Sequence, residues 1–411
     1  MDFDCLDTKK VLKWEHIQAV GDLPDARRCH SLNAVGSSRL VLFAGDGHGG
    51  VRLKNDTFIF HINEKRWEKL NIKGHQLPPP RWYHSATSLI PTWNDEIPIY
   101  NSHILVFGGR SAFSYLNDLF LLDIENQTWT RVVAKGDTPA PRWCHTMTLL
   151  PGHRVLLFGG SYEMGRSHQK YGFEDLHVLH LDKMEWKKQP IQVGFKNTEN
   201  MKLHLQRESH TTCYSNNKIF ISFGCSMQDD AIATVLVMDP ETLQIMRVID
   251  TSQLIPPLAT RQGSSATPLF QTNVTLTQTV NRIVFYGGEN DSKERKPLSD
   301  IIILETESER WYRSSEDFTV MPPSLDNATP NNNNEAPTVH LARAYQAAEG
   351  IGSKVYVFGG QAESYENLLS DLLVLETEVC PPSLLEQCIK FTASKDTYFT
   401  TTDLQNLPAE L

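Results

Sequence analysis

Six times along the chain, a short run of β-branched and aromatic residues ends in a glycine pair or a close variant of one. The runs are LVLFAGD (40–46), ILVFGGR (104–110), VLLFGGS (155–161), IFISFGCS (219–226), IVFYGGE (283–289) and VYVFGGQ (355–361). Their glycines follow one another at intervals of 51 to 72 residues. One such unit cannot bury its own apolar faces, so the repetition predicts a circular or solenoidal fold in which neighbouring units cover each other.

Each run belongs to a larger unit with a fixed order of parts. The run is preceded by a four-residue prelude that begins with arginine, and it is followed by an Asp-Leu strand and, in four units, by a tryptophan. The preludes are RRCH (27–30), RWYH (81–84), RWCH (142–145), RESH (207–210), RQGS (261–264) and RAYQ (343–346), and the tryptophans are Trp67, Trp129, Trp186 and Trp311. This order predicts four short strands per unit. Glycine is expected where the second strand ends, because a side chain there would collide with the neighbouring unit and because a positive φ is expected at this position.

Two units depart from the pattern. The first reads Ala44-Gly45. In the fourth, Cys225 is expected to replace the second glycine, and Met246 stands near the tryptophan position. We expect these two units to be less regular than the others.

The ends of the chain predict how the ring closes. Trp14 begins a tryptophan strand that has no glycine run before it, whereas the last unit ends after SDLLVLET (370–377) with no tryptophan strand. The strand at the start therefore matches the strand missing at the end. Closing the ring in this way removes free sheet edges.

The order and period of these parts resemble the kelch β-propeller family over residues 11–378. The resemblance implies an all-β, six-bladed propeller over residues 1–378, closed by an N-terminal strand. Residues 313–338 are rich in Asn, Pro and Ser, and such a composition predicts a mobile loop insertion between the last two blades. Residues 379–411 lie outside the repeat and are expected to form a short C-terminal helical tail.

The tail carries a second resemblance. SLLEQC (383–388) has the spacing of an elongin BC-box, and LPAEL (407–411) is similar to the core of a Cullin-2 box. Kelch-domain substrate receptors of Cullin-2 RING ubiquitin ligases have a similar layout, which implies elongin B/C and a cullin as partners. The residues that this resemblance assigns to adaptor binding are Leu384, Leu385, Cys388, Leu407 and Pro408. One departure from the BC-box pattern is Thr392, which stands where a hydrophobic residue is expected, four residues after the cysteine. The alternative is a scaffold for trafficking or cytoskeletal partners, with the tail capping the propeller.

Two sets of loops are candidates for ligand binding: the middle residues of the preludes and the residues after the glycines. Together they offer aromatic walls and arginines, which suit an extended peptide with a carboxylate. The candidate peptide-binding residues are Arg28, Trp82, Tyr83, Arg110, Trp143, Arg166, Ser209 and Tyr345. By resemblance to kelch receptors that recognise C-terminal degrons, Arg110 would hold the terminal carboxylate. The arginines, histidines and tryptophans that recur in register are interpreted as packing residues.

Composition argues against several other classes of protein. A net charge of −10 disfavours a nucleic-acid-binding surface, and no apolar run reaches the roughly 18 residues of a membrane span. The seven cysteines contain no Cys-x-x-Cys pair, and the sequence lacks both a nucleophile elbow and a phosphate loop. Some kelch propellers are oxidases or isomerases. The plant specifier proteins, which resemble them, bind iron through a Glu-x-x-x-Asp-x-x-x-His spacing that this sequence lacks. We therefore expect a non-catalytic protein without metal or cofactor, located in the cytoplasm, the nucleus or both, as the N-terminus does not resemble a signal peptide.

Overall fold

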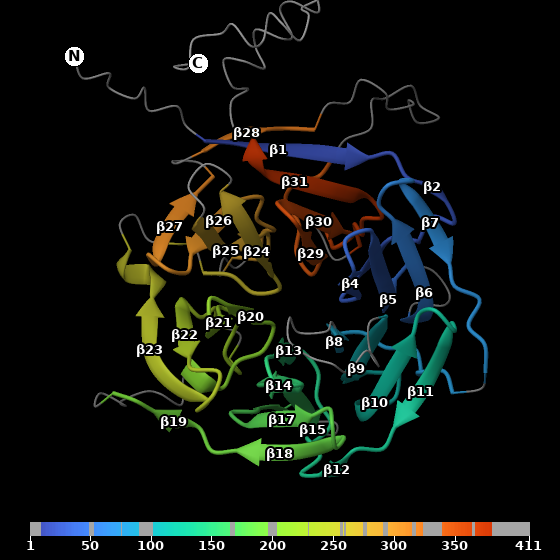
Figure 1. Ribbon diagram of the computed structural model, residues 1–411, viewed down its shortest axis with the longest axis vertical. Helices are drawn as coiled ribbons and strands as arrows, with labels where there is room; N and C mark the ends of the chain where they lie inside the picture. Colours follow the sequence, from blue (N-terminus) through green and yellow to red (C-terminus); the bar gives the residue numbers. More distant parts are fainter. Residues whose placement is uncertain are drawn as a thin grey trace, which may run out of the picture.

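In the computed structural model, the chain folds into a ring of six blades, each a small sheet of mainly antiparallel strands (Figure 1). The structure describes residues 10–48, 53–74, 76–89, 102–164, 169–195, 204–228, 230–254, 258, 260–273, 278–290, 295–314, 318–323, 339–363 and 366–379. The all-β, six-bladed propeller expected from the repeat is confirmed. Among these residues, no helix is long and apolar enough to cross a membrane.

Each blade has four main strands, which run from the axis outward in chain order except in blade 6, where the N-terminal strand is the outermost of the four (Figure 1). Blade 1 contains β4 (Ser31–Val35), β5 (Arg39–Gly47), β6 (Leu53–His61) and β7 (Arg66–Lys69). Blade 2 contains β8 (Ser85–Leu89), β9 (His103–Arg110), β10 (Tyr115–Asp123) and β11 (Thr128–Val132). Blade 3 contains β13 (Thr146–Leu150), β14 (Arg154–Phe158), β17 (Leu176–His180) and β18 (Glu185–Gln189).

The second half of the ring repeats this plan. Blade 4 contains β20 (Thr211–Ser215), β21 (Lys218–Ser222), β22 (Thr234–Met238) and β23 (Gln244–Asp250), followed by the 3-10 turn η3 (Thr251–Gln253). Blade 5 contains β24 (Ser265–Asn273), β25 (Gln278–Tyr286), β26 (Ile301–Glu305) and β27 (Arg310–Arg313). Blade 6 contains β29 (Ala347–Ile351), β30 (Lys354–Phe358), β31 (Leu372–Val379) and β1 (Lys10–Ile17).

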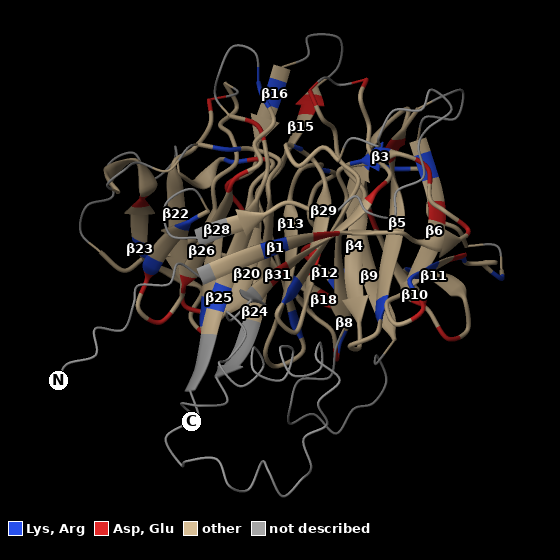
Figure 2. Ribbon diagram, turned by 90° about the horizontal axis from the view of Figure 1, so that it is seen from above, with Lys and Arg blue, Asp and Glu red and all other residues tan. Residues whose placement is uncertain are grey.

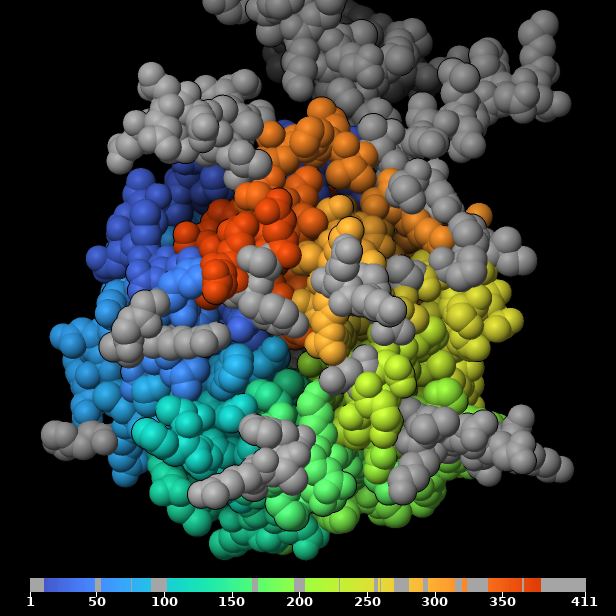
Figure 3. All heavy atoms as spheres, turned by 180° about the vertical axis from the view of Figure 1, so that it is seen from behind, coloured from blue at the N-terminus to red at the C-terminus, as the bar shows by residue number. Residues whose placement is uncertain are grey.

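The core is divided among the interfaces between blades. The six innermost strands contact one another around the axis, and a separate apolar cluster fills each interface. Figure 3 shows the blades in sequence order around the ring, seen from the opposite side. The recurring tryptophans reach across these interfaces: Trp129 packs on Phe43 at 4.7 Å and Trp186 on Phe107 at 5.5 Å between ring centroids. Each blade therefore buries the apolar face of its neighbour.

The N-terminal strand closes the ring as predicted. β1 pairs with β31 in the antiparallel register that sets Trp14 opposite Leu375, and Trp14 packs against Tyr286 of blade 5. On its other side β1 pairs in parallel with β28 (Phe318–Met321). This short strand lies inside the segment 313–338, so part of the expected loop insertion belongs to the sheet of blade 6.

Other blades carry a similar short parallel strand on the outside. β2 (Val20–Gly21), β12 (Lys135–Gly136) and β19 (Gln192–Val193) pair with β7, β18 and β23. In each case the linker that enters a blade lies against that blade's outermost strand. β28 occupies the corresponding place in blade 6, which explains why a polar segment contains a strand.

The glycine pair ends each second strand for the predicted reasons. Gly108 and Gly109 have φ values of 63° and 91°. A Cβ on Gly108 would lie 3.0 Å from the Arg142 carbonyl oxygen of the next blade. In blade 4 the expected substitution is corrected: Phe223, with φ of 59°, replaces the first glycine, Gly224 is the second, and Cys225 is the residue that follows the pair. The side chain of Phe223 packs against Phe285 of blade 5 instead.

The tryptophan position of blade 4 is filled by Ile245 rather than by Met246. Ile245 lies opposite Met238, as Trp186 lies opposite Leu179 in blade 3. Ile245 is fully buried, whereas the neighbouring Met246 is 37% exposed. The alternation of side chains along a strand therefore sends Met246 to solvent.

The first arginine of every prelude is a buried structural residue. In five blades its guanidinium forms paired hydrogen bonds with an aspartate that lies in the third strand or directly before it, as Arg142 does with Asp175 at 2.6 and 2.8 Å. The five pairs are Arg27–Asp56, Arg81–Asp118, Arg142–Asp175, Arg261–Asp300 and Arg343–Asp371. The same arginine also donates to the carbonyl of the first glycine position, as Arg142 does to Gly159. These bonds fix the prelude at the end of its blade.

One two-stranded element stands apart from the blades. β15 (Ser161–Met164) and β16 (Gln169–Gly172) form a hairpin between the second and third strands of blade 3. Figure 2 shows that the hairpin projects at the same end of the molecule as β3 (Arg27–Arg28). This end, where the second strands finish at the glycines, carries both sets of candidate loops, and we call it the glycine end.

Candidate functional site

The third residue of each prelude lies at the axis of the ring. These residues are Cys29, Tyr83, Cys144, Ser209, Gly263 and Tyr345, and all have φ values between 50° and 61°. The backbone N–H of each donates to the carbonyl of the same residue in the preceding blade, at 2.8 to 3.1 Å. Six hydrogen bonds thus form a closed circle, which we call the central ring. Because the ring is closed by backbone hydrogen bonds, it does not require one particular side chain at these positions.

A cavity of about 180 Å³ lies on the axis beside this ring. It is lined by the central ring and by the fourth prelude residues, among them His84 and His210. Burial lowers the pKa of both imidazoles to about 3, and burial raises the pKa of the Cys29 thiol to about 12. At neutral pH these groups are uncharged. The axis therefore offers a neutral polar lining rather than a thiolate nucleophile.

Around the central ring, the second prelude residue pairs with the residue after the glycines. The pairs are Arg28–Asp46, Trp82–Arg110, Trp143–Ser161, Glu208–Cys225, Gln262–Glu289 and Ala344–Gln361, joined through their backbones. We call them the rim pairs. The backbone frame is constant, whereas the twelve side chains share no common chemistry. Variable side chains on a fixed frame are typical of a binding surface.

Arg110 is the basic member of an aromatic group in blades 2 and 3. Its guanidinium lies 5.2 Å from the ring centroid of Trp143 and 5.3 Å from that of Tyr115. Trp82 and Tyr83 extend the group, each within 5.8 Å of Trp143. Within the described residues Arg110 has no ion pair and no side-chain hydrogen bond. Its half-buried charge is therefore held by aromatic faces and remains available for a carboxylate.

Phe113 extends this group to the outside of the molecule. It is 98% exposed at the tip of a turn in which the Ser111 hydroxyl accepts hydrogen bonds from the backbone N–H groups of Phe113 and Ser114. A fixed turn that presents a phenyl ring to solvent, three residues from Arg110, suits contact with an apolar side chain of a ligand.

Arg28 has a different environment from Arg110. Its guanidinium contacts the Asp46 carboxylate at 3.3 Å and donates to Gln361, and it is almost fully buried. Gln361 in turn donates to Glu289 at 2.5 Å, and the Tyr345 hydroxyl donates to the same carboxylate at 3.2 Å. Burial raises the pKa of Glu289. This network joins blades 1, 5 and 6, and it uses the charge of Arg28 internally.

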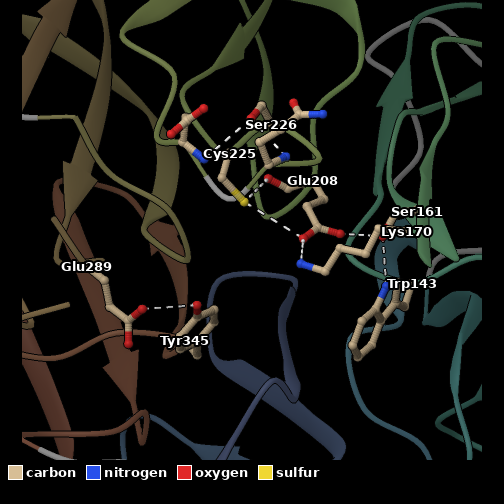
Figure 4. Close-up of polar contacts among 10 residues, drawn as sticks. Trp143, Ser161, Lys170, Glu208, Cys225, Ser226, Glu289 and Tyr345 are labelled. Carbon is tan, nitrogen blue, oxygen red and sulfur yellow. Dashed lines mark hydrogen bonds and ion pairs between the residues drawn. The ribbon is translucent and has the colours of Figure 1, made fainter. Parts of the chain in front are cut away.

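A second network joins blades 3 and 4 (Figure 4). The indole N–H of Trp143 donates to the Ser161 hydroxyl at 2.8 Å, and Ser161 donates to the Glu208 carboxylate. The Lys170 ammonium binds the other oxygen of Glu208 at 3.0 Å, and the Cys225 thiol lies 3.8 Å from it. Glu208 is thus a buried carboxylate with partners on both strands of the hairpin.

The structure brings together most of the residues that the sequence singled out for peptide binding. Arg110, Trp82, Tyr83 and Trp143 form one group, and Tyr345 contacts Tyr83 at 5.7 Å between ring centroids. Ser209 lies in the central ring. Arg28 lies nearby, but it is engaged with Asp46. Arg166 and the adaptor residues Leu384, Leu385, Cys388, Leu407 and Pro408 lie outside the described residues, so their roles stay predictions.

Sequence reasoning did not single out several members of the site. Glu208 and Gln361 owe their importance to partners in other blades, which no local pattern indicates. Phe113 lies in a loop that the repeat places correctly, and Tyr115 begins the strand that follows it, but the exposure of Phe113 and the contacts of Tyr115 depend on the turn. Among the described residues, His, Cys, Asp and Glu side chains form no group of three or more that could hold a metal ion.

Comparisons with known proteins agree with this architecture. A sequence model described as the KLHDC2/KLHL20/DRC7 Kelch-repeats domain matches residues 1–192 and 97–277. Kelch domain-containing protein 10 of Xenopus tropicalis is 27% identical over 215 residues, which are 51% of this chain and 47% of that protein. Adagio-like protein 3 of Oryza sativa subsp. japonica is 31% identical over 189 residues, 45% of this chain and 27% of that protein.

A flagellar outer arm dynein alpha chain of Chlamydomonas reinhardtii is also similar, with 33% identity over 180 residues, 42% of this chain and 4% of that protein. The chain thus spans less than half the length of the curated relatives named here. The family match, by contrast, covers more than half of the chain and coincides with four complete blades. The chain therefore belongs to the KLHDC2/KLHL20/DRC7 Kelch-repeats domain family.

Proposed function

We propose that this protein is the substrate-recognition subunit of a Cullin-2 RING E3 ubiquitin ligase, and that its glycine end binds a short C-terminal peptide of the substrate. The observation that carries the peptide-binding part is Arg110. A guanidinium that lies on two aromatic rings, without an ion pair among the described residues, is a receptor for a carboxylate. The aromatic group and Phe113 would contact the side chains that precede it.

The mechanism that follows is proximity. The propeller would hold the substrate while the tail docks elongin B/C and a cullin, and the effective concentration of substrate lysines near the ubiquitin-charged enzyme would rise. The chain itself performs no chemistry in this proposal. The adaptor part is supported by the sequence of the tail, where Leu384 and Cys388 occupy the BC-box positions.

The adaptor part is tested by co-purification with elongin B/C. Wild-type protein should retain elongin B/C, and the double variant Leu384→Ser, Cys388→Phe should lose it. Absence of elongin B/C from the wild-type protein would refute the ligase assignment and would favour the scaffold hypothesis.

The peptide part is tested separately with two synthetic peptide libraries of identical sequences, one with free C-terminal carboxylates and one with C-terminal amides. The protein should select peptides from the first library only. Arg110→Ala should weaken their affinity at least tenfold, because a hydrogen bond to a charged group contributes about 1.5–3 kcal/mol. Arg131→Ala, on the exposed outer strand of the same blade, is the matched control and should bind normally. Equal capture of amidated peptides would exclude carboxylate recognition.

A further inference from the structure

Glu208 is the only acidic residue at the second position of a prelude, and the fold alone does not explain why an acid stands there. The equivalent residues of the other preludes are Arg28, Trp82, Trp143, Gln262 and Ala344, so the propeller does not require an acid there. Glu208 is only 4% exposed. A buried carboxylate is costly unless hydrogen bonds and charge compensate it, and here the partners are Ser161, Lys170 and Cys225.

The hydrogen bonds between Glu208 and Trp143 have a fixed direction. An indole nitrogen only donates, so the Ser161 oxygen must accept from Trp143 and send its own proton to Glu208. Glu208, as an acceptor, thereby sets the orientation of the Ser161 hydroxyl and of the Trp143 ring. The face of that ring supports the Arg110 guanidinium. A chain of four residues therefore connects a carboxylate of blade 4 to the basic group of blade 2.

The same carboxylate holds both strands of the hairpin. Ser161 is the first residue of β15, and Lys170 lies on β16. The other Glu208 oxygen binds Lys170 at 3.0 Å. The hairpin also packs on blade 4 through Gly172, where a Cβ would lie 2.5 Å from the Met227 sulfur. Without Glu208, the hairpin would lose the ion pair that joins Lys170 to this residue of blade 4.

The hairpin presents apolar groups beyond the rim. Tyr162 stacks on Tyr171 at 5.3 Å and on Phe173 at 5.5 Å between ring centroids. Met164 and Tyr171 are 51% and 36% exposed. On its other side, the hairpin faces Tyr115. Burial raises the pKa of Tyr115 to about 12, and the nearby Glu163 carboxylate of the hairpin contributes to this rise. The hairpin thus stands next to the Arg110 group and forms a wall beside it.

We propose that Glu208 is the positioning residue of the peptide site: it orients the Trp143 ring beneath Arg110 and fixes the β15–β16 hairpin as a wall of the site. The significance for peptide binding rests on the proposed function. The positioning itself is a property of the free protein and can be measured without any peptide. Glu208 would therefore influence peptide affinity although it lies beneath the surface.

Three variants separate the two arms of this network. Ser161→Ala cuts the connection to Trp143 and leaves the Glu208–Lys170 ion pair. Lys170→Met cuts the ion pair and leaves the connection to Trp143. Glu208→Gln weakens both, because its amide would have to accept from Ser161 while presenting a donor to Lys170. Glu241→Gln, in the exposed ion pair with Arg154, is the matched control.

Two readouts on the peptide-free protein decide the matter: hydrogen exchange of the hairpin amides, and exchange of the Trp143 indole N–H observed by nitrogen-15 NMR. Ser161→Ala should accelerate indole exchange about tenfold or more and leave the hairpin protected. Lys170→Met should do the reverse, and Glu208→Gln should accelerate both. Exchange in β13 and β14 should not change, which separates positioning from general destabilisation of blade 3.

Unchanged exchange of both groups in Glu208→Gln would overturn the proposal. So would accelerated exchange throughout blade 3 in all three variants, because that result describes an ordinary structural residue. In the second stage, free-carboxylate peptides should bind at least tenfold more weakly to Glu208→Gln than to wild type. Failure of wild-type protein to bind any peptide would refute the proposed function, while the exchange data would still decide the role of Glu208.

Discussion

A single residue distinguishes blade 4 from the other five at the buried arginine. Arg207 is fully buried like its equivalents, but Thr234 stands where the others have aspartate. Its guanidinium donates to the carbonyls of His204, Phe223 and Thr234 and to the Thr234 hydroxyl. Burial lowers the pKa of Arg207 to about 9. The arginine is retained because the carbonyl contacts position the prelude even without an ion pair.

The missing carboxylate predicts a stabilising substitution. The cost of burying Arg207 is already included in the native state, so Thr234→Asp should raise the free energy of unfolding by about 1 kcal/mol or more through charged hydrogen bonds. The reverse change in blade 3, Asp175→Thr, should lower it by about 3–5 kcal/mol, because it removes one partner of a buried pair. Urea unfolding at pH 7 measures both. If Thr234→Asp destabilised the protein as much as Asp175→Thr does, an aspartate at position 234 could not form the expected hydrogen bonds with Arg207.

At the scale of the strand, the fourth unit shows how register decides which side chain is buried. Its outer strand β23 lacks a tryptophan, and the sequence alone favoured Met246 as the substitute. The pairing with β22 instead places Ile245 inward, in the apolar cluster between blades 3 and 4. A shift of one residue along a strand exchanges the two faces, so proximity to the expected position was a weak guide.

This register predicts unequal effects for two adjacent substitutions. Ile245→Ala should reduce the free energy of unfolding by about 2–5 kcal/mol, because it leaves a cavity in the cluster. Met246→Ala should change it by less than about 0.5 kcal/mol, as is usual for exposed positions. Urea unfolding curves of the two variants provide the comparison. A larger effect at Met246 would mean that β23 is shifted by one residue.

At the scale of the whole molecule, the sequence was sufficient wherever a residue acts within its own repeat. The glycine pairs, the tryptophans and the strand that contains Trp14 define blades, interfaces and closure, because the same local pattern recurs in register. Most of the aromatic residues around Arg110 could be placed for the same reason. Their loops follow repeated positions, and the ring brings those positions together.

The connections between blades could not be predicted. Arg28 binds Gln361, which lies 333 residues away in sequence, and Gln361 binds Glu289. All three residues belong to rim pairs, in blades 1, 6 and 5, and only the closed ring makes them neighbours. The hydrogen bonds that Glu208 accepts from Ser161 and Lys170 are of the same kind. Local sequence patterns describe each side chain, whereas the networks depend on the order of blades around the axis.

The ring as a whole should be sensitive to acid through its histidines. His30, His84, His145 and His210 lie between blades, each packed edge-on against a phenylalanine of the preceding blade. Burial lowers the pKa of all four, to about 3 for His84 and His210. Between about pH 3 and 6.5 the unfolded chain therefore binds more protons than the native protein. Stability should be fully present above about pH 6.5 and decline as the pH falls.

Two acids act in the opposite sense. Burial raises the pKa of the half-buried Glu349 to about 7 and also raises that of Glu289, so their contributions to stability decline as the pH rises above about 4.5. Four histidines outweigh these two carboxyls. Each histidine should contribute up to about 1.4 kcal/mol per pH unit below pH 6.5, and the net slope should be positive between pH 4 and 6.

His145→Gln tests this account with a residue that the chain already uses. Blade 6 has Gln346 at the equivalent position, and its amide donates to the Tyr286 carbonyl of the preceding blade at 2.8 Å. A glutamine cannot bind a proton in this pH range. The free energy of unfolding of the variant should therefore rise less steeply between pH 4 and 6, by about the contribution of one proton, while the contact between blades is kept. Urea unfolding measured across that range gives the slope directly. A variant with the wild-type slope would show that His145 does not contribute to the acid sensitivity of the ring.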